Sequence, residues 1–306
     1  ADLSLRLADY SHEGIDMMSS YRAGIMWEVI EGYAIRANYS RSQRAPNITE
    51  LMSPPRGDFD SFTDICDGVT VDSTDVGHDN CRKDAGIQAT IQALGVFEEQ
   101  SSSKYSPNTG NPLLSEETAD TYTLGITMAP SFLEGFQMSV DYYDITIDDV
   151  ITSIDNEDIL RNCYASKVPY GEGNAFCNDI RRDSEGQIQE VLQREFNLNQ
   201  WQTRGVDVAA AYSYSLGEYG NLRLRADWTH LIEWSETFED NDGLQSNDYV
   251  GELSSGFFQD KVSTSVSWTL DKLRVTWRTK YKSSIVDDFD RLYHPEDGWY
   301  ALQAAN

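Results

Sequence analysis

The chain has 306 residues, of which 51 are acidic and 24 are Lys or Arg, and its formal net charge is −27. A molecule this acidic repels phosphate backbones, so we expect no nucleic-acid partner. The mean hydropathy is −0.52, and the absence of any apolar stretch of about 18 residues excludes a transmembrane helix. A transmembrane β-barrel remains open, because alternating apolar and polar residues average to a soluble-looking hydropathy.

Apolar and polar residues alternate repeatedly along the chain, which is typical of strands with two different faces. In residues 33–40, for example, Tyr33 and Ile35 lie on one face while Arg36 and Asn38 lie on the other. The runs cover residues 3–9, 21–29, 33–40, 122–128, 136–142, 206–214, 222–228, 262–270 and 273–281, and another begins near Trp299. The pattern predicts about ten strands.

The connections between these runs alternate between short and long. Short links lie at residues 29–32, 130–134, 216–220 and 270–272, and long ones at 42–116, 149–199, 235–255 and 284–297, with a modest one at 11–19. Antiparallel neighbours joined in this way place all tight turns at one end and all long loops at the other. That layout favours an outer-membrane barrel over a soluble sandwich, which needs no such asymmetry.

Charged residues stand in the middle of the predicted strands, where contact with lipid would be costly. They are tolerated if they face a hydrated lumen. These charged residues are Arg22, Arg36, Asp141, Asp207, Arg223, Arg225, Arg274 and Arg278. Aromatic residues gather beside the short turns, with Trp27 and Tyr33 at one and Tyr212 and Tyr214 at another. We therefore predict an all-β, transmembrane antiparallel barrel.

Four cysteines form two local pairs in polar segments. Cys66 and Cys81 are 15 positions apart, and Cys163 and Cys177 are 14 apart. No C-x-x-C occurs and the four histidines are scattered, so a zinc site is the weaker interpretation. The spacing favours two disulfides, Cys66–Cys81 and Cys163–Cys177, and therefore an oxidising compartment.

The longest predicted loop contains two further features. Residues 82–98 place Ile87, Ile91 and Leu94 at helical spacing, which predicts a short amphipathic helix packed on the loop. Residues 58–79 hold seven aspartates, which suit a hard cation such as calcium. Their spacing does not match an EF-hand loop, so we favour a solvated acidic segment and expect no metal.

The sequence offers no good candidate for an enzyme. It contains no G-x-S-x-G, H-E-x-x-H, phosphate-binding loop or dinucleotide-binding fingerprint. The residues of a Ser-His-Asp triad come together only in the folded protein, so their spacing in the sequence does not exclude one. No trio of such residues stands out. We expect neither catalysis nor a cofactor.

Several stretches resemble the TonB-dependent outer-membrane receptors. Residues 40–51, SRSQRAPNITEL, resemble a strand-to-loop signature ending in R-A-P-x-x-x-E-L, with Arg44, Ala45, Pro46, Glu50 and Leu51 in the motif positions. Residues 114–130, LSEETADTYTLGITMAP, resemble the start of a following strand, and residues 136–151 and 197–212 resemble two later strands. The cysteine segments are similar to a subgroup with disulfide-bonded extracellular loops.

The resemblance implies a barrel of roughly 22 strands, of which residues 1–306 would supply about strands 11 to 20. A plug domain and the final strands would then lie outside this chain. It also implies the outer membrane of a Gram-negative bacterium, with lipid and lipopolysaccharide around the barrel. Further implied partners are the TonB–ExbB–ExbD complex, coupled through the absent N-terminal part, and a surface lipoprotein.

By the same resemblance, the long loops capture a scarce nutrient that energy from the inner membrane then imports. Candidate ligand contacts are Arg44, Asn47, Tyr105, Tyr170 and Trp201. For Arg44 we favour a structural role, pairing with Glu50 or the loop backbone, over ligand contact. We expect an oligosaccharide or another organic compound. The alternatives are a siderophore or metal-chelate receptor of the same fold, a surface β-protein without transport, and a passive porin.

Overall fold

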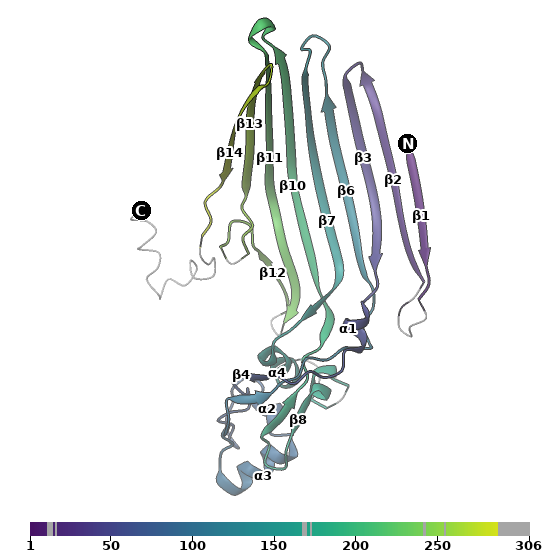
Figure 1. Cartoon of the computed structure of the whole chain (residues 1–306). Coiled ribbons are helices and arrows are strands. Elements are labelled where there is room, and N and C mark those ends of the chain that lie inside the picture. Colours follow the sequence, from purple (N-terminus) through teal and green to yellow (C-terminus); the bar gives the residue numbers. More distant parts are fainter. Residues whose placement is uncertain are drawn as a thin grey trace.

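A computed structural model of the chain describes residues 1–10, 15, 17–166, 170–171, 173–240, 243–253 and 255–286. One large antiparallel sheet dominates the molecule, and a lobe of loops, short helices and small hairpins lies at one end of it (Figure 1). In the part that is described, no helix has the length and apolar character needed to cross a membrane.

The large sheet is a meander in which strands follow one another in the order of the sequence. Its path is β1-β2-β3-β6-β7-β10-β11-β13-β14, and β12 pairs with β11 beside this path. The strands are β1 Asp2–Ala8, β2 Met18–Ile30, β3 Tyr33–Arg44, β6 Glu117–Met128, β7 Phe136–Ser153, β10 Glu195–Ser215, β11 Asn221–Asp240, β12 Gly243–Asp248, β13 Asp260–Leu270 and β14 Leu273–Lys282. The predicted all-β antiparallel fold is confirmed, and the run near Trp299 lies outside the described residues.

The short connections between β2 and β3, β6 and β7, β10 and β11, and β13 and β14 lie at one end of the sheet, as the lengths of the connections predicted (Figure 1). The β10–β11 turn contains the 3-10 helix Gly217–Tyr219 and ends at Gly220, whose φ is +90°. A Cβ at Gly220 would lie 2.1 Å from the Thr269 carbonyl oxygen, so a side chain does not fit there. Glycine thus allows β10 and β11 to reverse closely beside β13.

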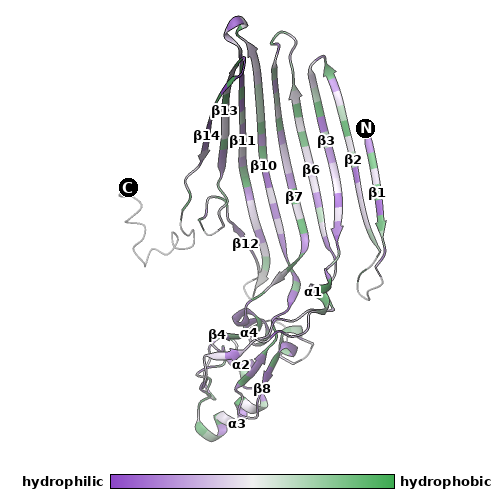
Figure 2. Cartoon of the chain, viewed as in Figure 1, coloured by the Kyte–Doolittle hydropathy of each residue, from purple (hydrophilic) through white to green (hydrophobic). Residues whose placement is uncertain are grey.

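The two faces of the sheet differ sharply in chemistry, and Figure 2 shows hydrophobic and hydrophilic stretches interleaved along the strands. One register row runs across eight strands on the apolar face: Trp27, Ile35, Ile126, Val140, Val208, Trp228, Val262 and Tyr281. The neighbouring row on the polar face contains Arg36, Gly125, Asp141 and Asp207. Mid-strand charges therefore point away from the apolar face, as predicted.

The polar face is built around side-chain pairs that cross the strands. Arg36 Nε and Nη2 donate to the two carboxylate oxygens of Asp141 at 2.7 and 2.5 Å. The pair passes over Gly125, where a Cβ would lie 2.0 Å from Asp141 Oδ1. A side chain on the intervening strand would therefore displace this ion pair.

Three central strands are longer than predicted, which corrects the loop limits 149–199 and 235–255. β7 has 18 residues, β10 has 21 and β11 has 20. A strand of that length spans roughly 70 Å at about 3.4 Å per residue, far more than an apolar band of about 25 Å. Beyond the band the apolar residues no longer keep to one face, so the alternation used for prediction disappears. Register shifts and a bulge at Asp149, whose φ is 56°, disturb it further.

The lobe is formed by residues 45–116, between β3 and β6, together with residues 154–194, between β7 and β10. Its helices are α1 Ile48–Met52, α2 His78–Cys81, α3 Ala85–Leu94, α4 Asn156–Tyr164 and the 3-10 helix η1 Ala175–Asp179. Its hairpins pair β4 Phe59–Ser61 with β5 Ser103–Tyr105 and β8 Ile180–Arg182 with β9 Ile188–Val191.

The lobe has a single hydrophobic core, to which residues 45–116 (the first excursion) and residues 154–194 (the second excursion) both contribute. The first supplies Phe62, Cys66, Val69, Cys81, Ile87, Ile91 and Phe97, and the second supplies Ile159, Leu160, Cys163, Tyr164 and Val191. Each excursion therefore buries its apolar residues against the other. The lobe therefore forms one unit at the end of the sheet.

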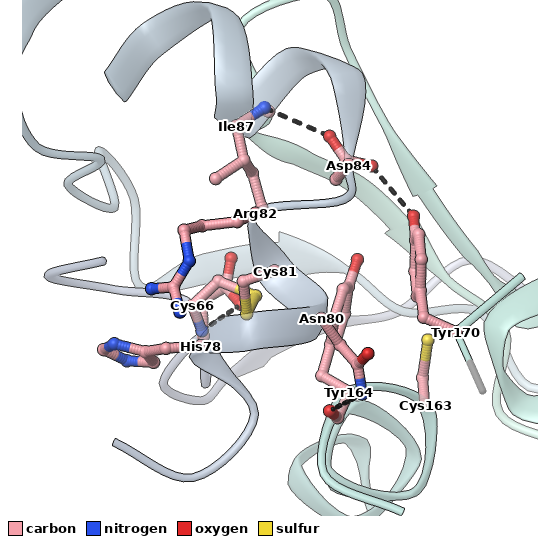
Figure 3. Close-up of a disulfide and its surroundings, with 12 residues drawn as sticks. Cys66, His78, Asn80, Cys81, Arg82, Asp84, Ile87, Cys163, Tyr164 and Tyr170 are labelled. Atoms are coloured by element: carbon pink, nitrogen blue, oxygen red, sulfur yellow. Dashed lines mark hydrogen bonds between the residues drawn. A yellow bond between two sulfur atoms is a disulfide. The ribbon is translucent and has the colours of Figure 1, made fainter. Parts of the chain in front are cut away.

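Each disulfide closes a short loop within one excursion, with the pairing that the sequence predicted. The Cα atoms are 5.6 Å apart in Cys66–Cys81 and 4.8 Å apart in Cys163–Cys177. Figure 3 shows Cys163 and Tyr164 lying beside the Cys66–Cys81 bridge, where Asn80 Nδ2 donates to the Tyr164 carbonyl at 2.6 Å. The two bridges thus stiffen the two halves of the same core.

Two expectations for the lobe need correction. The predicted helix exists as α3, and Ile87 and Ile91 are buried, but Leu94 is 75% exposed because the helix ends beyond the core at Gly95. The aspartates of residues 58–79 are not all solvated either. Asp64 is only 2% exposed, because Arg182 from the other excursion donates to it at 2.5 and 2.8 Å.

Candidate ligand-binding site

A groove of about 1010 Å³ lies where the lobe meets the long ends of β7, β10 and β11. Its walls come from α4, from the segment around η1 and from the strand ends. The lining residues are Asn108, Thr152, Ser153, Ile154, Asp155, Asp158, Arg161, Asn162, Ser166, Gly173, Asn174, Ala175, Phe176, Gln193, Asn197, Leu198, Asn199, Glu236 and Phe238. A cavity of this size is at the upper end of those that bind small organic molecules.

Amides and carboxylates dominate the polar lining. Five asparagines contribute to it, together with Asp155, Asp158 and Glu236, whereas Arg161 is the one cation among the lining residues described. Burial and the nearby Asp155 carboxylate raise the pKa of Asp158 above its ordinary value. The groove therefore favours ligands with many hydrogen-bonding groups and opposes a highly charged anion.

Some of these asparagines build the groove, and others are available to a ligand. Asn174 Nδ2 donates to the Asn162 carbonyl at 2.8 Å, and Asn197 Nδ2 donates to the Asp149 carbonyl at 2.8 Å. The side chains of Asn108, Arg161 and Asn162 have no hydrogen-bond partner within the described part of the chain. These three groups can therefore donate to a bound molecule without breaking a hydrogen bond between described residues.

A buried ion pair fixes the lobe behind the groove. The Arg182 side chain is 4% exposed and contacts Asp64, and its Nε donates to the Tyr164 hydroxyl at 2.8 Å. Burial opposes the charge of Arg182, but the hydrogen bonds from it to Asp64 raise its pKa above the ordinary value. Because Tyr164 ends α4, this network holds the groove wall against the first excursion.

Two of the predicted ligand contacts lie inside the lobe and outside the groove. The Tyr170 ring stacks on Tyr164 with centroids 5.1 Å apart, and its hydroxyl donates to Asp84 at 3.1 Å (Figure 3). The Tyr105 ring packs on Phe59 with centroids 5.4 Å apart. The structure therefore gives both tyrosines packing contacts.

Arg44 and Asn47 lie at the end of β3, also away from the groove. Arg44 Nε donates to Glu117 at 2.5 Å, and its Nη1 donates to both oxygens of Glu50 at 3.1 Å. Asn47 caps α1 by accepting from the backbone of Thr49 and Glu50, and Glu50 accepts from the Asn47 backbone in return. Ala45 and Leu51 pack in a small core with Leu114. This motif links β3, α1 and β6.

Sequence reasoning did not single out Asn199, Glu236, Arg161 or Asn162 as site residues. The first two were placed at the ends of predicted loops, whereas they lie within β10 and β11. The available signal was the run N-L-N-Q-W at residues 197–201, in which three amides precede a tryptophan. Trp201 was predicted, and it lies next to Asn199 and Glu236 at one end of the groove.

The sequence matches one protein family over almost its whole length. The family described as TonB dependent receptor-like, beta-barrel matches residues 1–304. No curated protein sequence matches the chain. The chain belongs to the TonB-dependent receptors, and this family resides in the outer membrane of Gram-negative bacteria.

Solved structures of similar fold include receptors for iron carriers. A mutant of the ferric enterobactin receptor PfeA from Pseudomonas aeruginosa, in complex with enterobactin, is 13% identical, with a TM-score of 0.50 over 89% of this chain and 29% of the receptor. The siderophore receptor PirA from Acinetobacter baumannii is 12% identical, with a TM-score of 0.50 over 92% of this chain and 32% of the receptor. The chain therefore spans about a third of these receptors, and the likeness concerns the fold alone.

Proposed function

We propose that this chain is part of an outer-membrane receptor that captures a polyhydroxylated, uncharged nutrient at the groove and imports it. The TonB–ExbB–ExbD complex would supply the energy, and the plug would lie in a part of the protein beyond this chain. Membership of the family supports this general activity. The kind of nutrient is inferred from the groove. The observation that supports it is the lining of the groove, which consists of amides and carboxylates with a single arginine.

The lining favours a neutral organic compound over a ferric siderophore. An anionic chelate would approach Asp155, Asp158 and Glu236, and Arg161 alone would not offset three carboxylates. Hydroxyl groups, in contrast, both donate to carboxylates and accept from Asn108 and Asn162. An oligosaccharide meets these conditions, and two partly buried aromatic residues, Phe176 and Phe238, are available beside them.

The test uses the whole receptor, purified and also expressed in cells with and without TonB. The purified protein is exposed to a printed array of neutral and acidic oligosaccharides and, in parallel, to ferric catecholate and hydroxamate chelates. We expect binding of a neutral oligosaccharide and its TonB-dependent uptake. Binding of ferric chelates alone would contradict the proposed nutrient, and uptake that persists without TonB would contradict active import.

Two substitutions connect the binding to the groove. Asn162→Ala removes an amide that has no partner within the described residues, so we expect weaker ligand binding without loss of the fold. Gln189→Ala serves as the control, because Gln189 lies on the lobe outside the groove and its side chain donates only to Asp183. Equal affinity in the Asn162 variant and the control would place the binding site elsewhere.

A further inference from the structure

Trp201 lies at the end of the groove that faces the membrane. It follows Asn199 by two positions on β10, so both side chains lie on the polar face of the sheet, which also carries Asp207. Because this face is turned toward the lumen, we also call it the lumenal face. Trp201 Nε1 donates to Glu236 Oε1 at 3.0 Å, and Asn199 Nδ2 donates to the same oxygen at 2.5 Å. Because Asn199 and Glu236 line the groove, the Trp201 ring lies just beyond it, connected to it through this shared carboxylate.

Trp234 packs beside this ring, and Tyr249 and Phe257 pack on Trp234 in turn. We refer to Trp201, Trp234, Tyr249 and Phe257 as the aromatic platform. The Trp234 ring lies 5.9 Å from that of Trp201 and stacks on Phe257 with centroids 4.2 Å apart. Tyr249 meets Trp234 edge-on at 5.5 Å, and its hydroxyl donates to Glu236 Oε2 at 3.3 Å. All four residues are only partly buried.

The platform is ordered before any ligand arrives. The Trp201 indole N–H is satisfied by Glu236, and both oxygens of Glu236 accept hydrogen bonds from protein groups. Immobilising these rings therefore costs little further side-chain entropy when a ligand binds. A fixed, partly exposed indole ring beside a carboxylate and an amide is a surface with an apolar face and a polar edge.

A pyranose ring has the complementary surface. Its C–H groups form an apolar face that packs on an aromatic ring, while its hydroxyls project from the edge and hydrogen-bond to carboxylate and amide groups. A phosphate or carboxylate would instead meet the negative charge of Glu236. The polar groove and the aromatic platform are distinct surfaces that meet at Glu236. A ligand must therefore have at least two linked rings to occupy both.

We propose that Trp201 is the stacking surface of a second sugar subsite, positioned by Glu236, and that the ligand is a neutral oligosaccharide spanning the groove and this subsite. The inference rests on the proposed function and adds the chain length of the ligand to it. Sugar rings would occupy the groove first and the aromatic platform next along the path toward the lumen.

The experiment compares two ligand lengths on the whole receptor. The neutral oligosaccharide that binds best on the array is titrated by calorimetry, together with the homologue that lacks one terminal ring but still fills the groove. We expect Trp201→Ala to weaken binding of the longer probe about tenfold, equivalent to about 1.4 kcal/mol, and to leave the shorter probe unaffected. Trp201→Phe should restore most of the affinity for the longer probe.

Each outcome separates the subsite from the proposed function. If Asn162→Ala weakens both probes while Trp201→Ala weakens neither, the subsite is wrong and the function stands. Equal losses for both probes in Trp201→Ala would also overturn the subsite, because they indicate a structural role. If no neutral oligosaccharide binds the unmodified receptor, both proposals fail. Heat-dependent gel migration, which reports the folded barrel, is measured for every variant.

Discussion

Arg44 lies where β3 leaves the lipid-facing part of the sheet, and its guanidinium bridges carboxylates from two elements. Glu117 belongs to β6 and Glu50 to α1, so the three charges connect a strand end, its neighbour and the first helix of the lobe. The planar fork of donors is suited to such a bridge, whereas a lysine would contact one carboxylate at a time. Arg44 therefore holds the end of β3 to β6 and to α1.

We predict that Arg44→Ala loosens this junction and leaves ligand affinity unchanged. The loss of both ion pairs should expose α1 and the following residues to protease, because Glu50 then retains only its capping contact with Asn47. Limited proteolysis of whole cells and calorimetry on the purified receptor measure the two effects. Normal protease resistance combined with lost ligand binding would assign Arg44 to ligand contact instead.

We also predict that Gly125→Ala destabilises the barrel through the pair of Arg36 and Asp141. The new methyl group would occupy the space of Asp141 Oδ1, so overpacking should cost about 1–3 kcal/mol. The free energy of unfolding in urea, measured on receptor folded into lipid vesicles, checks this value. The double variant with Asp141→Ala should recover part of the loss, since shortening residue 141 restores the space.

At the scale of elements, the strands and their order follow from periodicity, whereas the lobe does not. Alternation places β2, β3 and β13 well because each residue faces either lipid or water. It covers too little of β10 and β11, because in the parts nearest the lobe apolar residues no longer keep to one face. The lobe core joins residues such as Asp64 and Arg182 across 118 positions, and no local pattern encodes that contact. The groove was missed because its lining joins the second excursion to strand ends as far along the chain as Glu236 and Phe238.

The disulfides give an element-scale prediction. Serine at both Cys163 and Cys177 should destabilise the lobe by about 2–4 kcal/mol, because the unfolded loop is no longer restrained. Protease should then cut within residues 154–194, while heat-dependent gel migration of the barrel stays normal. Serine at Cys66 and Cys81 is the matched variant and should open residues 58–100 instead. Loss of the folded barrel in either variant would show that lobe and sheet are one cooperative unit.

At the scale of the whole molecule, neighbouring residues on one strand test the assignment of the faces. Val208 belongs to the apolar row, whereas Ala209 lines a hollow of about 720 Å³ on the lumenal face. Val208→Arg should destabilise the receptor by about 2–4 kcal/mol near the bilayer midplane, and Ala209→Arg by far less. Urea unfolding in lipid vesicles measures both. Similar losses for the two variants would contradict the assigned orientation of the sheet.

The shared core of the lobe also orders the events of biogenesis. Each sulfur bridge joins cysteines 14 or 15 positions apart, so either can form as soon as its own segment reaches an oxidising compartment. Neither bridge joins the two excursions, which meet through side-chain packing, hydrogen bonds such as that from Asn80 to Tyr164, and the ion pair of Asp64 with Arg182. The core of the lobe is therefore complete only when both segments lie on the same side of the membrane. The proposed groove, whose lining includes Asn108 from the first segment, is complete only after that meeting.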